Sequence, residues 1–561
     1  MRTAIKTIFL LGIILLACNG LWGCKGGSIA RIGNITGPDS LKENAAAEFS
    51  ITTESGTNVK YAWSCDPAEA GQFENPTSQS AKFTANEVET DTQVQIRVIV
   101  SSDQYGPILK TKNLQILDIK TGWVRTWDAE ARGLCTDSLG NIYALGELDG
   151  FTLGKFSGNN ELFWTLTIEG EIESEGDGKA IAIDLSGDIY IVGSFESSVD
   201  FNPGNGVADR TSAGESDAFL IKFNSGGEFL WVQTWGGSGD DGCTGVLVDG
   251  VGDIYVTGSF SDSVDFDPGV NTYERASNGH ADSFVTKFNS AGDFQWVRTW
   301  GGSQYDSPKG SLAWDHSGNI YVTGRFSGDV DFDPGPGTDF HNSGAWQGAF
   351  LCKFADNGEF HWAKTWGGDG VIDVTGIAGN GSDLFVVGWF SDIQGSGAID
   401  FDPGPGTDIH VTEGREDAFM SKFNSMGDFQ WAKTWGGEGA LDDAYGIAVD
   451  LAGNIYVTGQ FRDGIDFDPG AGEEYHPGEW FDAYLSKYDA GGEFQWVRTW
   501  GGTGWDYGYD VALDEEGNIF IIGNFMGTVD FDPGPEIENH MAIVFQDGYL
   551  LKLRPNGFWH D

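Results

Sequence analysis

One short segment occurs seven times between residues 141 and 523 of this chain. Each copy is strand-like and ends in glycine, as in NIYVTG or DIYIVG, and the copies begin at Asn141, Asp188, Asp253, Asn319, Asp383, Asn454 and Asn518. A WxxT segment also occurs seven times, and after a first step of 41 residues its copies lie 65 to 69 residues apart. A period of this length, filled with short strands and Gly-rich turns, predicts the blades of a β-propeller rather than a helical solenoid.

Each full repeat contains four strand-like pieces, the number of strands in a propeller blade. In the sixth repeat they cover residues 446–450, 454–461, 483–488 and 494–500. The chain enters the repeats with a fourth-strand segment, GWVRTW, and leaves them with a third-strand segment, GYLLKL. We therefore expect the N-terminal strand to complete the seventh blade, because this pairing closes the ring and leaves no open sheet edge.

The segments GNIYVTGxF, DFDPG, DAFLxKF and WxxTWGG recur across residues 121–561. Together they resemble the repeat of the bacterial SBBP family, whose name denotes a seven-bladed β-propeller. The resemblance implies the fold and an exported setting, and it supplies no catalytic residues. The expected fold is all-β: a seven-bladed propeller of four-stranded blades over residues 121–561, preceded by an immunoglobulin-like (Ig-like) β-sandwich.

Residues 28–118 contain no copy of these segments, but they contain several alternating strands around one central tryptophan, Trp63. A stretch of this length and pattern predicts a β-sandwich. The segment YAWSC, followed by AKFTANEVETDTQVQIRVIV, resembles bacterial Ig-like or PKD-like modules. The resemblance implies a spacer between a membrane anchor and a head.

The chain begins with basic residues and a short apolar stretch that ends in LLAC, with Cys18 last. This order predicts a secretory signal, and the apolar stretch is too short to span a bilayer as a mature helix. LLAC resembles a bacterial lipobox, which implies a signal peptide over residues 1–17, lipidation of Cys18 and a tether over residues 18–27. Cys24 is the alternative lipidation site, and an ordinary secretory signal is the alternative interpretation. We expect an exported bacterial lipoprotein, anchored to a membrane and facing the periplasm or the cell surface.

The chain has 84 Asp and Glu residues against 32 Lys and Arg residues, a formal net charge of −52. This charge repels nucleic-acid phosphates and anionic lipid surfaces. We therefore expect no nucleic acid partner, and contact with a membrane only through the N-terminal lipid. The excess of carboxylates favours cations instead.

Acidic segments fill the two kinds of link that share one end of an antiparallel blade. The link from second to third strand contains DFDPG or DFNPG, and the link to the next blade contains segments such as GGSGDDG. Alternate carboxylates beside a Pro-Gly turn suit calcium, which takes about six to eight oxygen ligands, but Asp-Pro-Gly is also a metal-free turn. The candidate calcium ligands are Asp265, Asp267, Asp331, Asp333, Asp400, Asp402, Asp466, Asp468, Asp530 and Asp532.

A basic residue follows the first Asp of each copy at a spacing of ten residues: Arg210, Arg275, His341, His410, His476 and His540. One interpretation is that each neutralises its own acidic loop. The other is that the histidines and aspartates bind a transition metal or another ligand, although arginine cannot ligate a metal. In the first blade only residues 149–150 join the second and third strands, so we expect a gap in the acidic face there.

A lysine recurs in the third strand of every repeat. A lysine inside a packed blade requires a carboxylate partner, because a buried unpaired charge is unfavourable. The aspartates five residues earlier are too far along the strand, so we expect a neighbouring strand to supply the partner. The lysines are Lys155, Lys222, Lys287, Lys353, Lys422, Lys487 and Lys552.

The sequence contains no nucleophile elbow, phosphate loop, HExxH segment or zinc-ligand cluster, so it identifies no catalytic residue. The leading hypothesis is a non-catalytic binding or scaffold module for a protein or glycan partner at the acidic face. The alternatives are a hydrolase or lyase that acts on polysaccharide at that face, and a purely structural envelope protein. An enzyme needs an acid and a base near the axis, whereas a binding module exposes aromatic side chains there. The aromatic candidates, all on links between blades, are Tyr305, Tyr445, Trp505 and Tyr507.

Overall fold

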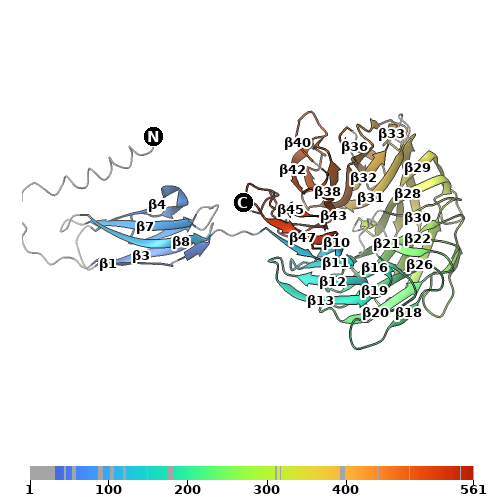
Figure 1. Cartoon of the computed structure of the whole chain (residues 1–561), viewed down its shortest axis with the longest axis horizontal. Helices are drawn as coiled ribbons and strands as arrows, with labels where there is room; N and C mark the ends of the chain where they lie inside the picture. Colours follow the sequence, from blue (N-terminus) through green and yellow to red (C-terminus); the bar gives the residue numbers. More distant parts are fainter. Residues whose placement is uncertain are drawn as a thin grey trace, which may run out of the picture. The chain divides into compact units, whose positions relative to one another are not determined.

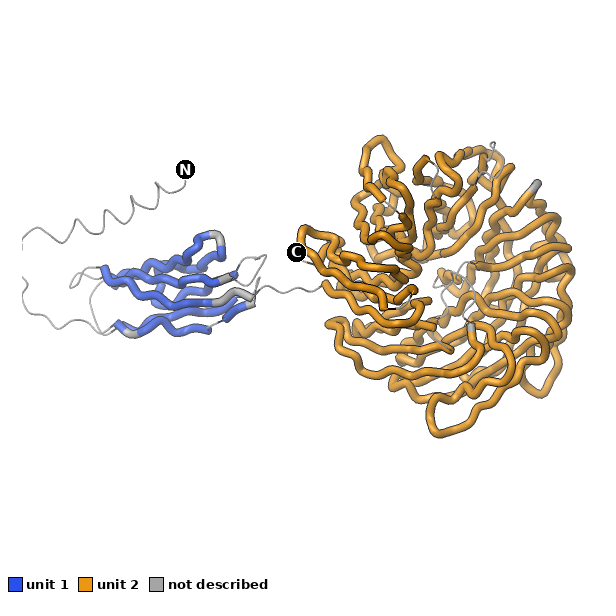
Figure 2. Tube along the Cα trace, in the orientation of Figure 1, with its two compact units in different colours: residues 1–120 blue, residues 121–561 orange. Residues whose placement is uncertain are grey.

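The computed structural model divides the chain into two compact units, Met1–Lys120 and Thr121–Asp561 (Figure 1, Figure 2). The structure describes residues 32–38, 40–42, 46–53, 59–85, 92–101, 107–117, 122–147, 150–173, 181–309, 312–315, 317–391, 398–438, 441–478, 480–543 and 545–559. The predicted signal peptide, both candidate lipidation cysteines and the tether lie outside these residues. Within the described ranges, no helix has the length and apolar character needed to cross a membrane.

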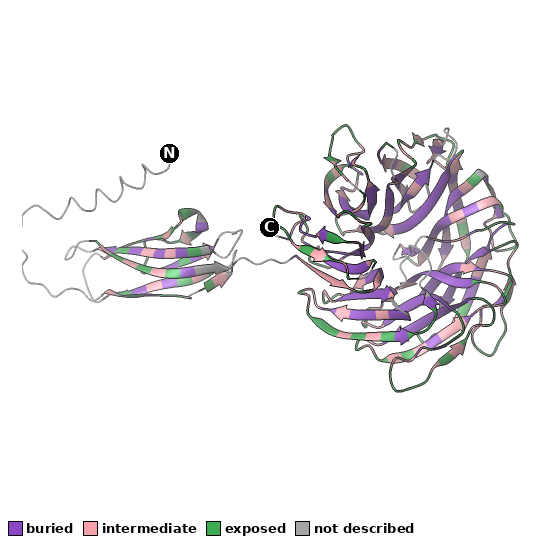
Figure 3. Ribbon diagram, viewed as in Figure 1, coloured by how far each residue is buried: buried purple, intermediate pink, exposed green. Residues whose placement is uncertain are grey.

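The first unit consists of two four-stranded sheets that share one core. One sheet has the order β1 (Ile32–Thr36), β3 (Ala46–Thr53), β6 (Ser80–Ala85) and β5 (Gly71–Glu74); the other has β2 (Ser40–Lys42), β8 (Ile108–Leu117), β7 (Thr92–Ser101) and β4 (Lys60–Asp66), with the 3₁₀ turn η1 (Ala68–Ala70) before β5. Buried and exposed residues alternate along the strands (Figure 3), as expected where one face of each sheet is covered. Phe49, Trp63 and Phe83 are central to the shared core. The relation of this first unit to Ig-like or PKD-like modules stays a prediction.

In the described part of the second unit, seven antiparallel sheets follow one another, each with four strand positions. Sheet 1 contains β10 (Glu130–Thr136), β11 (Ile142–Glu147), β12 (Gly150–Phe156) and β13 (Leu162–Glu169). In sheet 2, β14 (Ile172–Glu173) and β15 (Ile181–Ile183) share the first position, before β16 (Ile189–Phe195), β19 (Asp217–Phe223) and β20 (Phe229–Trp235). Sheet 3 contains β21 (Asp241–Val248), β22 (Ile254–Phe260), β25 (Asp282–Phe288) and β26 (Phe294–Trp300).

The remaining four sheets follow the same order of first to fourth strand. Sheet 4 contains β27 (Leu312–Trp314), β28 (Asn319–Asp331), β29 (Phe340–Ala355) and β30 (Phe360–Gly368), and sheet 5 contains β31 (Val371–Gly379), β32 (Asp383–Ser391), β35 (Glu416–Asn424) and β36 (Phe429–Trp435). Sheet 6 contains β37 (Asp443–Val449), β38 (Ile455–Arg462), β41 (Phe481–Tyr488) and β42 (Phe494–Trp500), and sheet 7 contains β43 (Tyr507–Leu513), β44 (Ile519–Phe525), β47 (Asp547–Leu553) and β9 (Trp123–Trp127).

Short hairpins extend the links from second to third strand, which the sequence analysis treats as loops. In sheet 4 the long strands β28 and β29 pair through this region themselves. The separate hairpins are β17 (Ser198–Asp200) with β18 (Asp209–Thr211), β23 (Ser263–Asp265) with β24 (Glu274–Ala276), β39 (Ile465–Asp466) with β40 (Tyr475–His476), and β45 (Thr528–Asp530) with β46 (Asn539–Met541). The hairpin of β33 (Ala398–Asp400) with β34 (Ile409–Val411) is not separate, because β33 pairs with the end of β30 in sheet 4.

The seven sheets surround a common axis. Each first strand contacts the first strand of the next sheet, and β43 of sheet 7 contacts β10 of sheet 1, so the ring closes (Figure 1). The fourth strand of sheet 7 is β9, which pairs antiparallel with β47 from Trp123 opposite Lys552 to Trp127 opposite Gly548. The N-terminal strand thus completes the last sheet, as the sequence predicts. The arrangement is consistent with a β-propeller.

Six of the recurrent lysines donate a hydrogen bond to a carbonyl of the next sheet: Lys155, Lys222, Lys287, Lys353, Lys422 and Lys552. The ammonium of Lys222 lies 2.9 Å from Asp188, at the start of the neighbouring second strand, and it donates to the carbonyl of Ser290 in sheet 3 at 3.4 Å. It also lies over the ring of Tyr190, 4.8 Å from the centroid. A neighbouring strand therefore supplies the carboxylate, as predicted, and the same holds for Lys287 with Asp253 and Lys422 with Asp383.

Pairs of aromatic rings fill the junctions between sheets. Phe266, the aromatic residue of DFDPG, is fully buried, and its ring lies 5.1 Å from Phe284 on the third strand. The ring of Phe284 in turn lies 6.3 Å from Trp235, on the fourth strand of the preceding sheet. We call Phe266 and Phe284 an aromatic pair. Such a pair occurs in each of sheets 2 to 7, with ring centroids 4.9 to 5.4 Å apart: Phe201–Phe219, Phe266–Phe284, Phe332–Phe350, Phe401–Phe419, Phe467–Tyr484 and Phe531–Tyr549.

The aromatic pair provides a test of the packing. Phe266→Ala removes a fully buried ring and leaves a cavity, so we expect the free energy of unfolding to fall by about 3–5 kcal/mol in urea titrations. Phe340→Ala is the matched control, because Phe340 is 71% exposed and its removal should change that free energy by no more than about 0.5 kcal/mol. Equal losses in the two variants would contradict the assignment of Phe266 to the core.

Candidate functional site

The links from second to third strand and the links between successive sheets meet at one end of the second unit, which we call the link face. Backbone bridges join the two kinds of link, as between Ala281 and Tyr305 and between Phe481 and Trp505. The predicted sharing of one face is therefore confirmed. The link face contains the DFDPG segments, the candidate aromatic residues, and the six basic residues that follow the first Asp of each DFDPG or DFNPG copy by ten positions.

The aspartates of DFDPG shape their own loops. Oδ1 of Asp265 accepts hydrogen bonds from the backbone N–H groups of Asp267, at 3.2 Å, and Tyr273, at 2.7 Å, and so closes the loop. Oδ1 of Asp267 accepts one from Gly269 at 2.8 Å. Both interactions recur, at 2.7 to 3.2 Å, for Asp331, Asp333, Asp400, Asp402, Asp466, Asp468, Asp530 and Asp532. These contacts are typical of an aspartate-capped turn.

The calcium interpretation of these loops stays a prediction. Among the residues that the structure describes, no three His, Cys, Asp or Glu side chains are grouped as a shared metal site requires. The capped turns therefore account for the motif geometry by themselves, and calcium remains a question for measurement.

Thermal unfolding of the full chain, with EDTA and with added calcium, tests this prediction. Calcium bound at Asp265 and Asp267 would raise Tm, because a ligand that binds only the folded state stabilises it. Replacement of both residues by Asn should remove the contribution of this loop and make the rise in Tm smaller. An Asn side chain keeps an oxygen that can accept these backbone hydrogen bonds, three in total, so the double variant retains the turn. A Tm that does not respond to calcium would assign the motif to turn formation alone.

The four histidines His341, His410, His476 and His540 lie in the links from second to third strand of sheets 4, 5, 6 and 7. Nδ1 of His341 lies 2.7 Å from the hydroxyl of Thr365, and Nε2 lies 3.4 Å from Asp339. The ring also contacts Phe332 edge-on, at a centroid distance of 5.4 Å. The structure thus keeps each histidine within its own sheet, beside the carboxylate two residues earlier; the same contacts occur at His410, His476 and His540.

A second set of aspartates on the link face is buried, and the sequence analysis does not single it out. In the link between sheets 2 and 3, Asp241 is 1% exposed. Its Oδ2 accepts a hydrogen bond from the N–H of Gly237 at 2.7 Å, and its Oδ1 accepts one from Ser261 at 3.0 Å. We call such residues staple aspartates, because they tie the link to the end of a second strand; the others are Asp306, Asp442 and Asp506.

Each staple aspartate has a second aspartate beside it, at the start of a third strand; Asp217, Asp282 and Asp417 are buried, and Asp482 is half-buried. The N–H of Asp241 donates to the carbonyl of Ser216 at 3.0 Å, which places Asp241 next to Asp217. Oδ2 of Asp217 accepts a hydrogen bond from Ala213 at 3.1 Å, whereas its Oδ1 is buried without a partner. The corresponding pairs are Asp306 with Asp282, Asp442 with Asp417, and Asp506 with Asp482.

The first glycine of WGG makes room for these pairs. A Cβ on Gly236 would lie 2.3 Å from the carboxylate of Asp217. At the junction of sheets 4 and 5 the pair is missing, because Gly348 takes the register position of Asp282. The link there is also short: only residues 369–370 separate β30 from β31.

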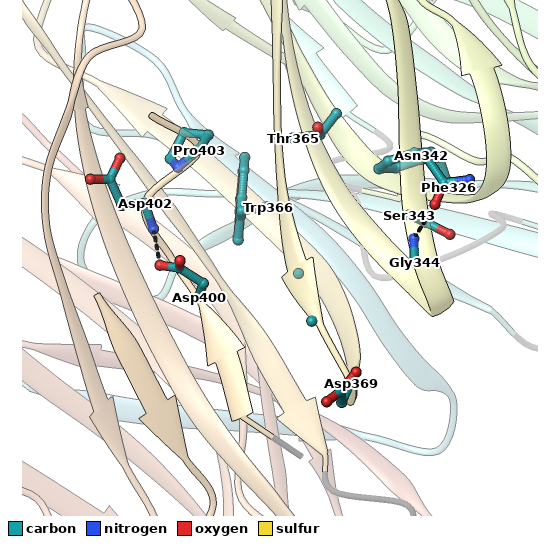
Figure 4. Close-up of a pocket in the computed structure, with 12 residues that line it drawn as sticks. Phe326, Asn342, Ser343, Gly344, Thr365, Trp366, Asp369, Asp400, Asp402 and Pro403 are labelled. Carbon is teal, nitrogen blue, oxygen red and sulfur yellow. Dashed lines mark hydrogen bonds between the residues drawn. The ribbon is translucent and has the colours of Figure 1, made fainter. Parts of the chain in front are cut away.

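A pocket of about 410 Å³ opens where this pair is missing (Figure 4). The end of β30, with Trp366, lies between Asn342 and Ser343 on one side and the DFDPG loop of sheet 5 on the other. Polar residues that line the pocket are Asn342, Ser343, Thr365, Asp369, Asp400 and Asp402. This polar hollow of the link face therefore coincides with a departure from the repeat.

Charged and hydroxyl groups also meet at the inner end of the link face. The first strands of sheets 1, 3, 5, 6 and 7 have a β-bulge there, a feature common beside functional sites. Asp373 is buried and lies 2.9 Å from Arg325 and 3.8 Å from Lys309. The hydroxyl of Tyr445 donates to buried Asp443 at 2.8 Å. The sequence predicts Tyr445 as an aromatic candidate at the acidic face. Its partner Asp443 and the ion pairs of Asp373 can be recognised only once the fold brings these residues together.

Three of the four candidate aromatic residues come together in sheets 6 and 7. Two of them, Tyr445 in β37 and Tyr507 in β43, lie in first strands rather than on the links where they are expected. Tyr507 stacks on Tyr509 at 5.5 Å, and Tyr509 lies 5.7 Å from Tyr445. Phe481 lies 6.5 Å from Tyr507 and 6.2 Å from Trp505, which is 42% exposed. We call these five rings the aromatic cluster.

The fourth aromatic candidate, Tyr305, stands in the link between sheets 3 and 4. Its side chain is 60% exposed, and its ring stacks on His280 at a centroid distance of 5.0 Å. The structure therefore leaves Tyr305 accessible and separate from the aromatic cluster.

Comparisons with known proteins support the repeat architecture. The model of the SBBP family, "Beta-propeller repeat", matches residues 430–460, from β36 into β38. The chain is 29% identical over 225 residues to "Regulatory protein FlaEY" of Caulobacter vibrioides, a match of 39% of this chain and 22% of that protein. It is 24% identical over 431 residues to "Uncharacterized WD repeat-containing protein L264" of Acanthamoeba polyphaga mimivirus, covering 63% and 30%. The chain thus spans less than a third of either relative.

Among solved structures, the chain is similar to Pseudomonas brassicacearum lignostilbene dioxygenase, with a TM-score of 0.30 and 10% identity over 85% of this chain and 93% of that one. Nothing about activity follows from a likeness of this size. The family match and the internal repeats support a β-propeller repeat protein, and the function has to be argued from the link face.

Burial raises the pKa of the staple aspartates, to about 7 for Asp241, about 6 for Asp306, about 8 for Asp442 and about 7 for Asp506. The charge of Asp417 adds to the effect at Asp442, and burial likewise raises the pKa of Asp417 to about 6. The two carboxyl groups therefore titrate as a pair that holds a proton in the folded state.

These raised pKa values predict a loss of stability as the pH rises. Between about pH 4 and 7 the folded chain binds more protons than the unfolded chain, so the free energy of unfolding falls by about 1.4 kcal/mol per pH unit for each extra proton. Asp417→Asn removes one titrating group, while its amide oxygen still accepts the hydrogen bond from Glu413. We expect the Tm of this variant to fall less than that of the wild type between about pH 5 and 8. Asp209→Asn, an exposed control, should keep the wild-type slope, and an unchanged slope in Asp417→Asn would contradict the pairing.

Proposed function

We propose that this chain is an exported, lipid-anchored bacterial protein, with an N-terminal Ig-like module and a seven-bladed SBBP-type propeller, that binds a glycan at the link face without catalysis. The repeat architecture and the family match support the propeller part of the proposal. The anchor, at Cys18 or alternatively Cys24, rests on the lipobox-like sequence. A protein partner at the same face is the alternative within this class.

The pocket between sheets 4 and 5 is the observation that carries the proposal (Figure 4). Its volume of about 410 Å³ suits a short sugar segment, since small-ligand sites span about 300–1,000 Å³. Carboxylate oxygens of Asp369 and Asp402 can accept hydrogen bonds from sugar hydroxyls, and the amide of Asn342 can donate and accept. Trp366 and Phe326 also line the pocket, but both are buried, so a sugar there would be held by hydrogen bonds from the polar residues.

The charge of the pocket narrows the class of glycan. Asp369, Asp400 and Asp402 line it, and no basic side chain does. Carboxylates repel phosphorylated sugars and uronates, and a net charge of −52 repels them at long range. The geometry therefore favours neutral glycans and amino sugars.

A glycan array probed with the full chain tests this function. We expect saturable binding to neutral or amino-sugar glycans and a loss of affinity of about tenfold or more in Asp369→Ala, because a hydrogen bond to a charged group contributes about 1.5–3 kcal/mol. Asp369 is exposed, so the substitution should leave Tm unchanged. Asp209→Ala, an exposed aspartate outside the pocket, is the control and should bind like the wild type. Binding confined to acidic glycans, or equal losses in both variants, would contradict the proposal.

Cleavage of polysaccharide is a second candidate function, favoured by the groups at the inner end of the link face. Asp443 with the hydroxyl of Tyr445, and Asp373 with Arg325, place an acid, a base and a cation at the contacting first strands β37 and β31. The array glycans that bind can be assayed for new reducing ends and for unsaturated products. If the wild type forms such reducing ends or unsaturated products and the Tyr445→Phe variant does not, an enzymatic function replaces the binding proposal. Absence of any ligand would favour a purely structural envelope protein.

A further inference from the structure

The junction between sheet 7 and sheet 1 lacks the aromatic pair that fills the other junctions. Thr152 stands opposite Gly146 in sheet 1, in the register position that Phe219 occupies opposite Gly193 in sheet 2. The DFDPG phenylalanine has no counterpart either, because β11 ends at Glu147 and β12 begins at Gly150. Both rings of the pair are therefore missing at this one place.

Two further positions at this junction have small residues. Ala144 and Gly154 are paired in sheet 1, where sheet 2 pairs Ile191 with Ile221. The tryptophan that packs against the aromatic pair elsewhere is retained: Trp127 on β9 pairs with Gly548 as Trp235 pairs with Ala218. Trp127 thus still covers this junction on the side of sheet 7, whereas the aromatic pair that packs against the tryptophan elsewhere is missing.

A pocket of about 400 Å³ occupies this junction. Trp127, Phe156, Leu162 and Ala144 supply apolar surface to it. Thr152 and Thr167 also line it, and their hydroxyls lie 2.9 Å apart. We call it the seam pocket, because it lies between the closing strand β9 and sheet 1.

A basic side chain stands at the same pocket. Arg125 lines it, donates two hydrogen bonds to Asn160 at 2.7 and 2.9 Å, and lies over the ring of Phe156. The guanidinium is therefore held in place beside the apolar wall. A ring with a polar edge suits this combination better than a plain hydrocarbon.

We propose that the seam pocket binds a small aromatic molecule of one or two rings with a polar group at its edge. The ligand takes the place of the missing aromatic pair, with its ring between Trp127 and Phe156 and its polar edge toward the threonine hydroxyls. The seam pocket shares no residue with the pocket between sheets 4 and 5, so this proposal does not depend on glycan binding. A ligand there would contact both β9 and sheet 1.

Calorimetric titration of the full chain with indole and with 1-naphthol tests the proposal. We expect saturable binding of at least one probe. Thr152→Phe restores the ring found in the other sheets, and Ala144→Ile fills the pocket from another strand, so each should reduce the affinity at least tenfold. Thr211→Phe, which places a ring on an exposed hairpin, is the control and should bind the probes like the wild type.

Two filling variants are used so that the test does not depend on a single substitution. A Tm measurement shows whether each variant is folded. Thr152→Phe and Ala144→Ile should also keep or raise Tm, because they replace a hollow by buried apolar surface. Saturable binding lost in the filling variants and kept in Thr211→Phe supports the seam pocket. No saturable binding of either probe to the wild type, or undiminished binding in a folded filling variant, overturns it.

Discussion

Ring-against-ring packing between neighbouring sheets is the interaction on which the second unit depends. A sheet of this kind has two apolar faces, and each is covered only when the next sheet is in place. One ring of each aromatic pair comes from a link rather than from a strand, since Phe266 sits inside DFDPG. The core and the link face are therefore built by the same residues, and a loop cannot move without withdrawing a ring from the core. A binding face held in this way is preorganised, which limits the entropy lost on association.

The departures from the repeat are more informative about function than the repeat itself. Gly348 interrupts the series of paired buried aspartates, and the polar pocket lies at that junction. Thr152 interrupts the series of aromatic pairs, and the seam pocket lies at that one. At the seam, Trp127 keeps the wall on the side of sheet 7, so the missing rings leave a shaped hollow instead of a collapsed contact.

The features that sequence reasoning could predict are those set by local pattern. The repeated strands, the completion of sheet 7 by β9 and the partners of Lys222 follow from alternation, spacing and the cost of a buried charge. The role of Asp265 was ambiguous, because an aspartate beside Pro-Gly suits both a cation and an amide eight residues away. The buried pair of Asp217 and Asp241 escaped prediction because its members belong to different repeats and meet only through the ring. The grouping of Trp505 with Tyr445 has the same cause.

The closing strand also determines how the molecule carries mechanical load. β9 is the first strand of the second unit along the chain, and it is held to β47 by a ladder of backbone hydrogen bonds. Tension applied from the N-terminal side reaches β9 before any other strand of the ring. If that ladder slipped, sheet 7 would lose its outer strand, and Trp127 would leave the junction with sheet 1. For this architecture, resistance to pulling is set by one five-residue strand and by whatever fills the space beside it.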